Sequence, residues 1–230
     1  MFTLPKATRT LFTAALLVAL PAAALAHDGH EAKRPSIVPA VPAPSAAATP
    51  AGKDHCATPA DAARIQAKYA QLPAPLPFQA TRELGLNEAV ISSALPEDLS
   101  LGVDGSHFRA VWDSVTGWGE ALILIQRGAH VLEVHSPLPA GEPSTRSKFF
   151  NLGTAPFSGH LRPDLLSAIH LVAIPGREGL VRGAFFYDAD GSHVFGAFIG
   201  GEGTEPSAQQ LAAFEKTWAL VKSLPRRCSG

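Results

Sequence analysis

Residues 180–199 read LVRGAFFYDADGSHVFGAFI, and this stretch indicates two neighbouring antiparallel strands. Leu180–Asp188 and His193–Ile199 are rich in aromatic and β-branched residues, which favour strands. Between them, Asp188-Ala-Asp-Gly191 offers acidic turn residues followed by glycine, which is a strong hairpin signal. The stretch therefore predicts a β-hairpin within an antiparallel sheet.

Further strands are expected before this hairpin, each bounded by glycine, proline or aspartate. Their apolar runs are short and roughly evenly spaced, which is typical of antiparallel sheets. The expected strands are Ala121–Gln126, Val131–His135, Lys148–Leu152, Ser158–Leu161 and Ala168–Ile174.

Helices are expected before and after these strands in the sequence. Thr58 can cap a helix whose first residue is Pro59 and which extends to about Leu72. The other expected helices are Gln79–Leu84, Asn87–Leu95, His107–Trp118 and Pro206–Leu224. Together the elements predict the α+β class, an antiparallel β-sheet flanked by helices.

The N-terminus has the composition of a secretory signal. Lys6 and Arg9 precede an apolar run without charge, which ends in the small-residue site Ala24-Leu-Ala26. Residues 1–26 are therefore interpreted as a cleavable signal peptide, with no membrane span after cleavage. This interpretation predicts a periplasmic or secreted protein.

Residues 27–57 are rich in proline and alanine and predict a flexible tether, whereas residues 58–230 predict one folded domain. Cys56 and Cys228 lie near opposite ends of this domain. In an oxidising compartment a disulfide between them is expected, with a contribution of about 4 kcal/mol to stability in the chain-entropy model.

Composition excludes several function classes. The 46% of hydrophobic residues excludes disorder throughout the chain. The 19 Lys and Arg residues against 20 Asp and Glu exclude a strongly basic nucleic-acid binder, and two cysteines exclude a four-thiolate zinc site. No nucleophile elbow, phosphate loop or paired-carboxylate motif is present in the sequence, so a non-enzymatic function is expected.

Nine histidines suggest metal or haem chemistry. His160 lies on a short strand beside small residues, which let a flat ligand approach the backbone. His130 and His135 are five residues apart, so a regular strand places them on opposite faces. His170 and His193 lie within expected strands and are interpreted as structural.

A second hypothesis places a metal site at His27 and His30. These imidazoles, the adjacent Asp28 and the α-amine of a chain starting at His27 are donors that suit Cu(II), Ni(II) or Zn(II). The alternative hypothesis is therefore a Cu- or Zn-binding protein.

The segment Phe108-Arg-Ala-Val-Trp-Asp-Ser-Val-Thr-Gly-Trp-Gly119 resembles the F-x-x-V-W-[DE]-x-V-x-x-W-G block of the HutX/ChuX haem-utilisation carrier family. Similar blocks follow in the family's order, so that the resemblance covers about Gln79 to Trp218. These blocks are Val131-Leu-Glu133, Leu138-Pro-Ala-Gly141, Phe150-Asn-Leu152, Gly159-His-Leu161, His170–Ile174, Phe186–Gly191 and Phe198-Ile-Gly200.

The resemblance implies a haem-binding α+β protein that forms a homodimer. Of the two family positions that supply histidine ligands to iron, one falls on His160 and the other on Gln126, a poor haem ligand. His130 or His135 is a candidate substitute, and Arg162 is a candidate partner for a haem propionate.

The resemblance implies reversible binding and transfer of haem b by a family whose typical members act in the cytosol. Together with the expected signal peptide, it predicts transfer in the periplasm, with components of a haem receptor or importer as partners. The metal-binding alternative would keep the scaffold without haem. A haem-degrading enzyme is a third hypothesis.

Overall fold

The computed structural model describes residues 55–127, 130–153, 157–177, 179–200 and 204–228, and within them the strands form two antiparallel sheets. The helices are α1 (Pro59–Tyr69), α2 (Pro77–Leu84), α3 (Glu88–Ser93), α4 (Phe108–Val115) and α5 (Ala208–Ser223). The strands are β1 (Ser100–Asp104), β2 (Glu120–Arg127), β3 (His130–Pro137), β4 (Glu142–Pro143), β5 (Phe150–Gly153), β6 (Ser158–Leu161), β7 (Leu166–Gly176), β8 (Gly179–Asp188) and β9 (His193–Ile199). The α+β class is confirmed.

The larger sheet has six strands in the order β1-β7-β8-β9-β2-β3, and β4-β5-β6 form the smaller sheet. The hairpin at residues 188–191 joins β8 to β9 as expected, with Gly191 at a φ of 78°. Alternation along the strands directs one set of side chains to each face of the larger sheet. Both faces are therefore available for helices.

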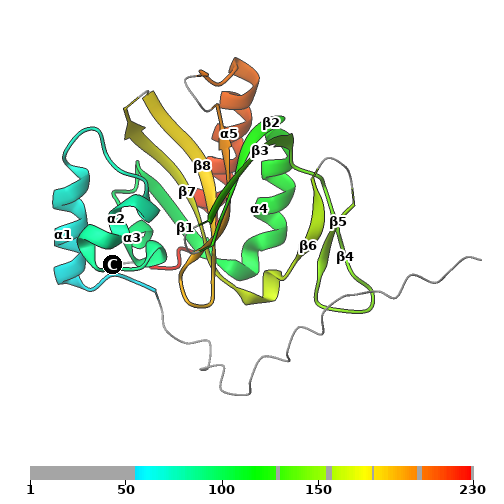
Figure 1. Cartoon of the computed structure of the whole chain (residues 1–230), viewed down its shortest axis with the longest axis horizontal. Coiled ribbons are helices and arrows are strands. Elements are labelled where there is room, and N and C mark those ends of the chain that lie inside the picture. Colours follow the sequence, from blue (N-terminus) through cyan, green and yellow to red (C-terminus); the bar gives the residue numbers. More distant parts are fainter. Residues whose placement is uncertain (1–54, 128–129, 154–156, 178, 201–203, 229–230) are drawn as a thin grey trace, which may run out of the picture. The chain divides into compact units, whose positions relative to one another are not determined.

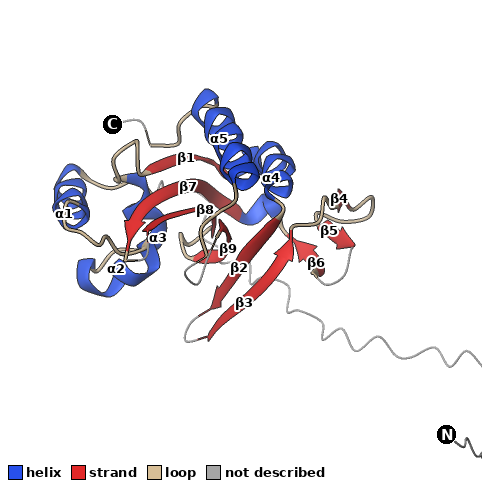
Figure 2. Cartoon of the chain, turned by 90° about the horizontal axis from the view of Figure 1, so that it is seen from above, coloured by secondary structure: helices blue, strands red, loops and turns tan. Residues whose placement is uncertain are grey.

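Each face of the larger sheet is covered by its own helices. On one face, Trp112 of α4 and Phe214 of α5 pack against Ile123, Ile169 and Phe186. Figure 2 shows α4 and α5 together on this side, and Figure 1 places the smaller sheet next to α4. On the other face α1, α2 and α3 cover a second apolar cluster. Their buried residues include Ile65, Tyr69, Ala80, Leu84 and Ile91.

Strand β1 was not expected from the sequence. It has only five residues, and Gly102 at its centre pairs with His170 of β7. A Cβ atom at residue 102 would overlap the His170 imidazole, so the glycine is required by close packing and not by a turn. The strand Lys148–Leu152 is also corrected, because β5 begins at Phe150.

The C-terminal segment Leu224–Cys228 returns to the edge of β1. Arg226 forms an isolated antiparallel bridge with Val103, and the backbone N–H of Arg227 donates to the carbonyl of Gly102 at 3.3 Å. The Arg227 guanidinium donates to Asp104 at 2.7 Å and to the Ser167 carbonyl. We call residues 224–228 the C-terminal strap.

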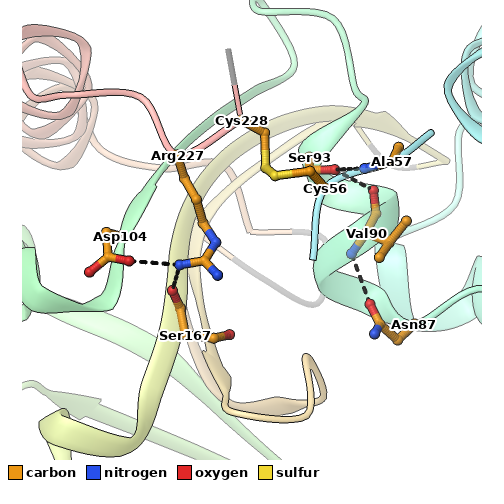
Figure 3. The surroundings of a disulfide bond; sticks show 9 residues. All are labelled: Cys56, Ala57, Asn87, Val90, Ser93, Asp104, Ser167, Arg227 and Cys228. Atoms are coloured by element: carbon orange, nitrogen blue, oxygen red, sulfur yellow. Dashed lines mark hydrogen bonds and ion pairs between the residues drawn. A yellow bond between two sulfur atoms is a disulfide. The ribbon is translucent and has the colours of Figure 1, made fainter. Parts of the chain in front are cut away.

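A disulfide between Cys56 and Cys228 fastens this strap, with the two Cα atoms 5.6 Å apart (Figure 3). Next to it, the backbone N–H of Ala57 donates to Ser93 of α3 at 3.0 Å. His55 is buried and its Nε2 lies 3.0 Å from the carbonyl of Ala189. Residues 55–57, which were assigned to the tether, therefore belong to the folded unit.

The expected signal peptide, residues 1–26, and residues 27–54 of the expected tether lie outside the described residues. None of the helices in the described ranges combines the length and the apolar character needed to cross a membrane.

Candidate functional site

His160 lies on the outer face of the smaller sheet. It is exposed and stands directly opposite Asn151 in the antiparallel β5–β6 pair, so the two side chains share a face. Nδ1 of His160 lies 2.8 Å from Oδ1 of Asn151. Of the residues predicted to bind haem, this is the one whose ring is held by a neighbouring side chain.

The inner face of the smaller sheet explains why His160 points outward. Phe150 and Leu152 of β5 are buried against α4, with the Phe150 ring centroid 5.2 Å from Phe108 and 5.9 Å from Trp112. Because side chains alternate along a strand, burial of Phe150 and Leu152 forces Asn151 to the opposite face. The core thus fixes the orientation of the candidate site.

Phe149 joins His160 to Arg162. Its ring centroid lies 5.7 Å from that of His160 and 5.6 Å from the Arg162 guanidinium carbon. Phe149 is 40% exposed, which is unusual for a large aromatic residue. Sequence reasoning missed Phe149, although its alternation with Phe150 was a signal for an outward aromatic side chain. It offers an apolar surface for a flat ligand.

Arg162 is held by Asp164 and is not a free cation. Its Nε and one terminal nitrogen donate to the two Asp164 carboxylate oxygens at 2.7 and 2.8 Å. The paired guanidinium lowers the pKa of Asp164 to about 2, and Lys148 lies 3.4 Å from the same carboxylate. A propionate would therefore compete with Asp164 for Arg162, which corrects the expectation of an available arginine.

A hollow of about 420 Å³ adjoins this group of residues. It is lined by Phe149, Phe150 and Lys148, among others, and Asp164 lies at the same hollow. Phe108 and Arg109 of α4 also line it, and His160 is not among its lining residues. The hollow therefore meets the group around His160 at Phe149 and Asp164.

Gln126 lies elsewhere, at the end of β2 in the larger sheet. Leu122 and Leu124 pack with the cluster under α1–α3, and alternation places Gln126 on that face. Its Oε1 is buried, and no described residue donates a hydrogen bond to it. No hydrogen bond, ion pair or ring contact within the described ranges links Gln126 to His160.

His130 and His135 are both exposed on β3, and they point to opposite faces of the sheet. His135 pairs with Leu122, and His130 pairs with Arg127. In the described part of the chain, neither has a hydrogen bond or ring contact with His160. An apolar hollow of about 310 Å³ on the larger sheet is lined by Leu122, Leu124 and Phe198, and none of the predicted haem-binding residues lines it.

Two other histidines are structural, as expected. His170 is buried and its Nδ1 lies 3.1 Å from the Ser100 hydroxyl. His193 is buried among aromatic rings, with the Phe185 ring centroid 5.0 Å away. Neither side chain reaches the surface where a ligand could bind.

The predicted metal site at His27 and His30 lies outside the described residues. Within the described ranges, no group of three or more His, Cys, Asp or Glu side chains is placed to hold a metal ion. The copper or zinc hypothesis therefore receives no support from the folded part.

Comparison with known proteins identifies the relatives of this chain. A family model described as "Haem utilisation ChuX/HutX" matches residues 101–217. The "Intracellular heme transport protein HutX" of Vibrio cholerae serotype O1 (strain ATCC 39315 / El Tor Inaba N16961) is 31% identical over 160 residues, which cover 66% of this chain and 81% of HutX.

The expected periplasmic or secreted location is contradicted by this comparison, because the relative HutX is described as intracellular. The expectation rested on two basic residues and an apolar run within residues 1–26. That pattern is a signal of composition alone, and it lies outside the described residues.

Solved structures give the same fold. ChuX matches with a TM-score of 0.63 and 24% identity, over 70% of this chain and 99% of ChuX. ChuS, an Escherichia coli haem oxygenase, matches with a TM-score of 0.54 and 17% identity, over 72% of this chain and 50% of ChuS. At these identities the likeness concerns the fold. The family model and the relative HutX decide the relationship, and the chain belongs to the ChuX/HutX family of haem-utilisation proteins.

Proposed function

We propose that this chain binds haem reversibly and transfers it to an acceptor protein, with the His160 imidazole on the iron. The observation that carries the proposal is the group on the outer face of the smaller sheet, where the exposed His160 ring is held by Asn151 and lies beside Phe149. Membership of the ChuX/HutX family and the transport role named for HutX support haem as the ligand.

Each residue of this group has a distinct task in the proposal. His160 supplies a nitrogen ligand, and Phe149 supplies an aromatic surface against which a porphyrin ring can stack. Because His160 is exposed, the iron remains accessible to a ligand from an acceptor. Ligation by one exposed histidine suits a carrier, which must release its cargo.

Replacement of His160 by alanine tests the proposal. In a haemin titration followed by visible spectroscopy, we expect a saturable Soret shift for the wild type and a loss of affinity of at least about tenfold for His160→Ala. His130→Ala and His135→Ala test the two histidines of β3 that were candidate second ligands. Because neither contacts His160 within the described residues, we expect both variants to leave the titration unchanged.

Two outcomes would contradict the proposal. Equal spectra and affinity for His160→Ala and the wild type would remove His160 as the ligand. Sustained production of a bilin or of CO from the haem complex would indicate an enzyme in place of a carrier.

Release of Arg162 from Asp164 should strengthen haem binding. In Asp164→Asn the Arg162 guanidinium loses its bidentate carboxylate partner and becomes available to a propionate. Because exposed ion pairs contribute about 0.2–1 kcal/mol, the expected gain in affinity is up to about fivefold and should diminish at high salt. Glu83→Gln, which frees Lys68 of α1 from its ion pair away from the hollow beside Phe149, is the control for a general charge effect. Unchanged affinity in Asp164→Asn would exclude Arg162 from the site.

We also propose that the functional unit is a homodimer. The chain matches half the length of ChuS, so two copies correspond in size to one ChuS chain. The edge strand β3 exposes Val131 and Leu132, apolar residues that a second copy could cover. Light scattering after size-exclusion chromatography should give a mass of two chains, and a mass of one chain at micromolar concentration would refute the dimer.

A further inference from the structure

We infer that Asn151 is a positioning residue that holds the His160 imidazole as the Nδ1–H tautomer and leaves the lone pair on Nε2. This tautomer is expected in the haem-free protein and does not depend on the proposed function. Its consequence for haem rests on the proposed function, because iron binds the imidazole nitrogen that carries the lone pair.

The hydrogen bond between these two residues determines the tautomer. The partner of His160 Nδ1 is Oδ1 of Asn151, at 2.8 Å. An amide oxygen accepts hydrogen bonds and cannot donate one. Nδ1 must therefore carry a proton, so the neutral imidazole has its lone pair on Nε2, to which no described residue donates a hydrogen bond.

The backbone holds Asn151 rigidly in this position. Strand β5 is the central strand of the smaller sheet and pairs with β4 on one side and β6 on the other. Phe150 and Leu152, the residues before and after Asn151, are both buried in the core. The amide is thus fixed before any ligand arrives, which is what an orienting group requires.

Phe149 restricts the ring from a second direction. The planes of the Phe149 and His160 rings meet at 57°, with the centroids 5.7 Å apart. The carboxylate of Glu142 faces the same side, because Glu142 pairs with Asn151 across β4 and β5. Glu142 lies on β4, one strand further from His160 than Asn151. The polar group directly opposite His160 is therefore the Asn151 amide.

The first test needs no haem. In nitrogen-15 NMR spectra of the haem-free protein, His160 of the wild type should show Nδ1 protonated and Nε2 unprotonated. Asn151→Leu removes the acceptor, so the Nε2–H tautomer should appear. Asn151→Asp keeps an acceptor and should keep the Nδ1–H tautomer. Ser158→Ala changes an exposed residue of β6 at the same face and is the control. The same tautomer in Asn151→Leu and the wild type would overturn the inference.

The second test measures haem affinity. Loss of a residue that orients a metal ligand typically weakens binding 10- to 100-fold, and we expect this range for Asn151→Leu. Asn151→Asp should restore most of the affinity, which a merely structural role of the amide would not predict. These substitutions face outward and leave the core intact.

The two tests separate the possible failures. If the NMR spectra show the expected tautomers but the wild type binds no haem, the inference stands and the proposed function fails. If haem binds through His160 and Asn151→Leu binds it as tightly as the wild type, Asn151 has no positioning role.

Discussion

Reduction of the Cys56–Cys228 disulfide should lower the free energy of unfolding by about 4 to 5 kcal/mol. The bond closes a loop between residues that are 172 positions apart, and in the chain-entropy model the effect grows with loop length. Urea titrations of the oxidised protein and of the protein in excess reductant measure the change. The double variant Cys56→Ser/Cys228→Ser should reproduce the reduced protein without reductant.

The strap should open first when the disulfide is reduced. The buried Nε of Arg227 has no hydrogen-bond partner among the described residues, and a buried terminal nitrogen of Arg226 has a 3.7 Å ion pair with Glu97 in place of a hydrogen bond. Unsatisfied buried donors are unfavourable, so they offset part of the stabilisation that the noncovalent contacts of the strap provide. Hydrogen exchange should therefore show fast exchange of the Arg227 amide, which donates to Gly102 in the oxidised protein.

Arg227→Ala is the matched control for this experiment. It removes the contacts of the guanidinium with Asp104 and Ser167 but leaves the disulfide in place. The expected loss is about 1 kcal/mol, the usual net contribution of a hydrogen bond. Equal stability of the oxidised and reduced proteins, with the Arg227 amide protected in both, would contradict the role assigned to the disulfide.

Much of the fold follows from local patterns in the sequence. Asp188–Gly191 gives the hairpin, and Thr58 caps α1 with a hydrogen bond to the Asp61 backbone. These features depend on neighbours in the chain, which a sequence displays. Strand β1 depends instead on Gly102 lying under the imidazole of His170, 68 positions later, and only the folded chain brings these residues together.

The candidate site also contains residues that the sequence predicted and partners that it did not. The resemblance to the family pointed to His160, and spacing placed His130 and His135 on opposite faces. The sequence did not reveal the partners of His160 and Arg162. Asn151 reaches His160 across two strands, and Asp164 reaches Arg162 through a turn whose geometry the sequence left open. The compartment was predicted wrongly, because composition near the N-terminus was the sole basis for it.

Acidification from pH 6.5 to pH 5 should also destabilise the protein strongly. Burial, reinforced by the nearby cations Arg226 and Arg227, lowers the pKa of His170 to about 3. Burial lowers the pKa of His193 to about 4, and the nearby Phe195 backbone opposes part of this lowering. Neither ring nitrogen of His193 makes a hydrogen bond of normal geometry within the described residues. In the unfolded chain both histidines should titrate at about pH 6.5.

The sign follows from proton binding. Below pH 6.5 the unfolded chain takes up a proton at each histidine, whereas the native state stays neutral until its lower pKa is reached. The free energy of unfolding therefore decreases as the pH is lowered, by up to about 1.4 kcal/mol per pH unit for each histidine. Burial raises the pKa of Glu88, so that as the pH falls the native state takes up a proton at Glu88 before the unfolded chain does, and this opposes the effect of the histidines.

His193→Phe should remove half of this dependence and stabilise the protein at pH 7. The His193 side chain is 3% exposed, and neither ring nitrogen has a hydrogen-bond partner among the described residues. Its neighbours Phe78 and Phe185 already form an aromatic environment, so a phenyl ring satisfies the site without buried polar atoms. We expect a gain of about 1 kcal/mol, the lower end of the cost of an unsatisfied buried group. An unchanged slope in His193→Phe would mean that His193 takes up its proton without unfolding, and that the aromatic cluster opens to water in the native state.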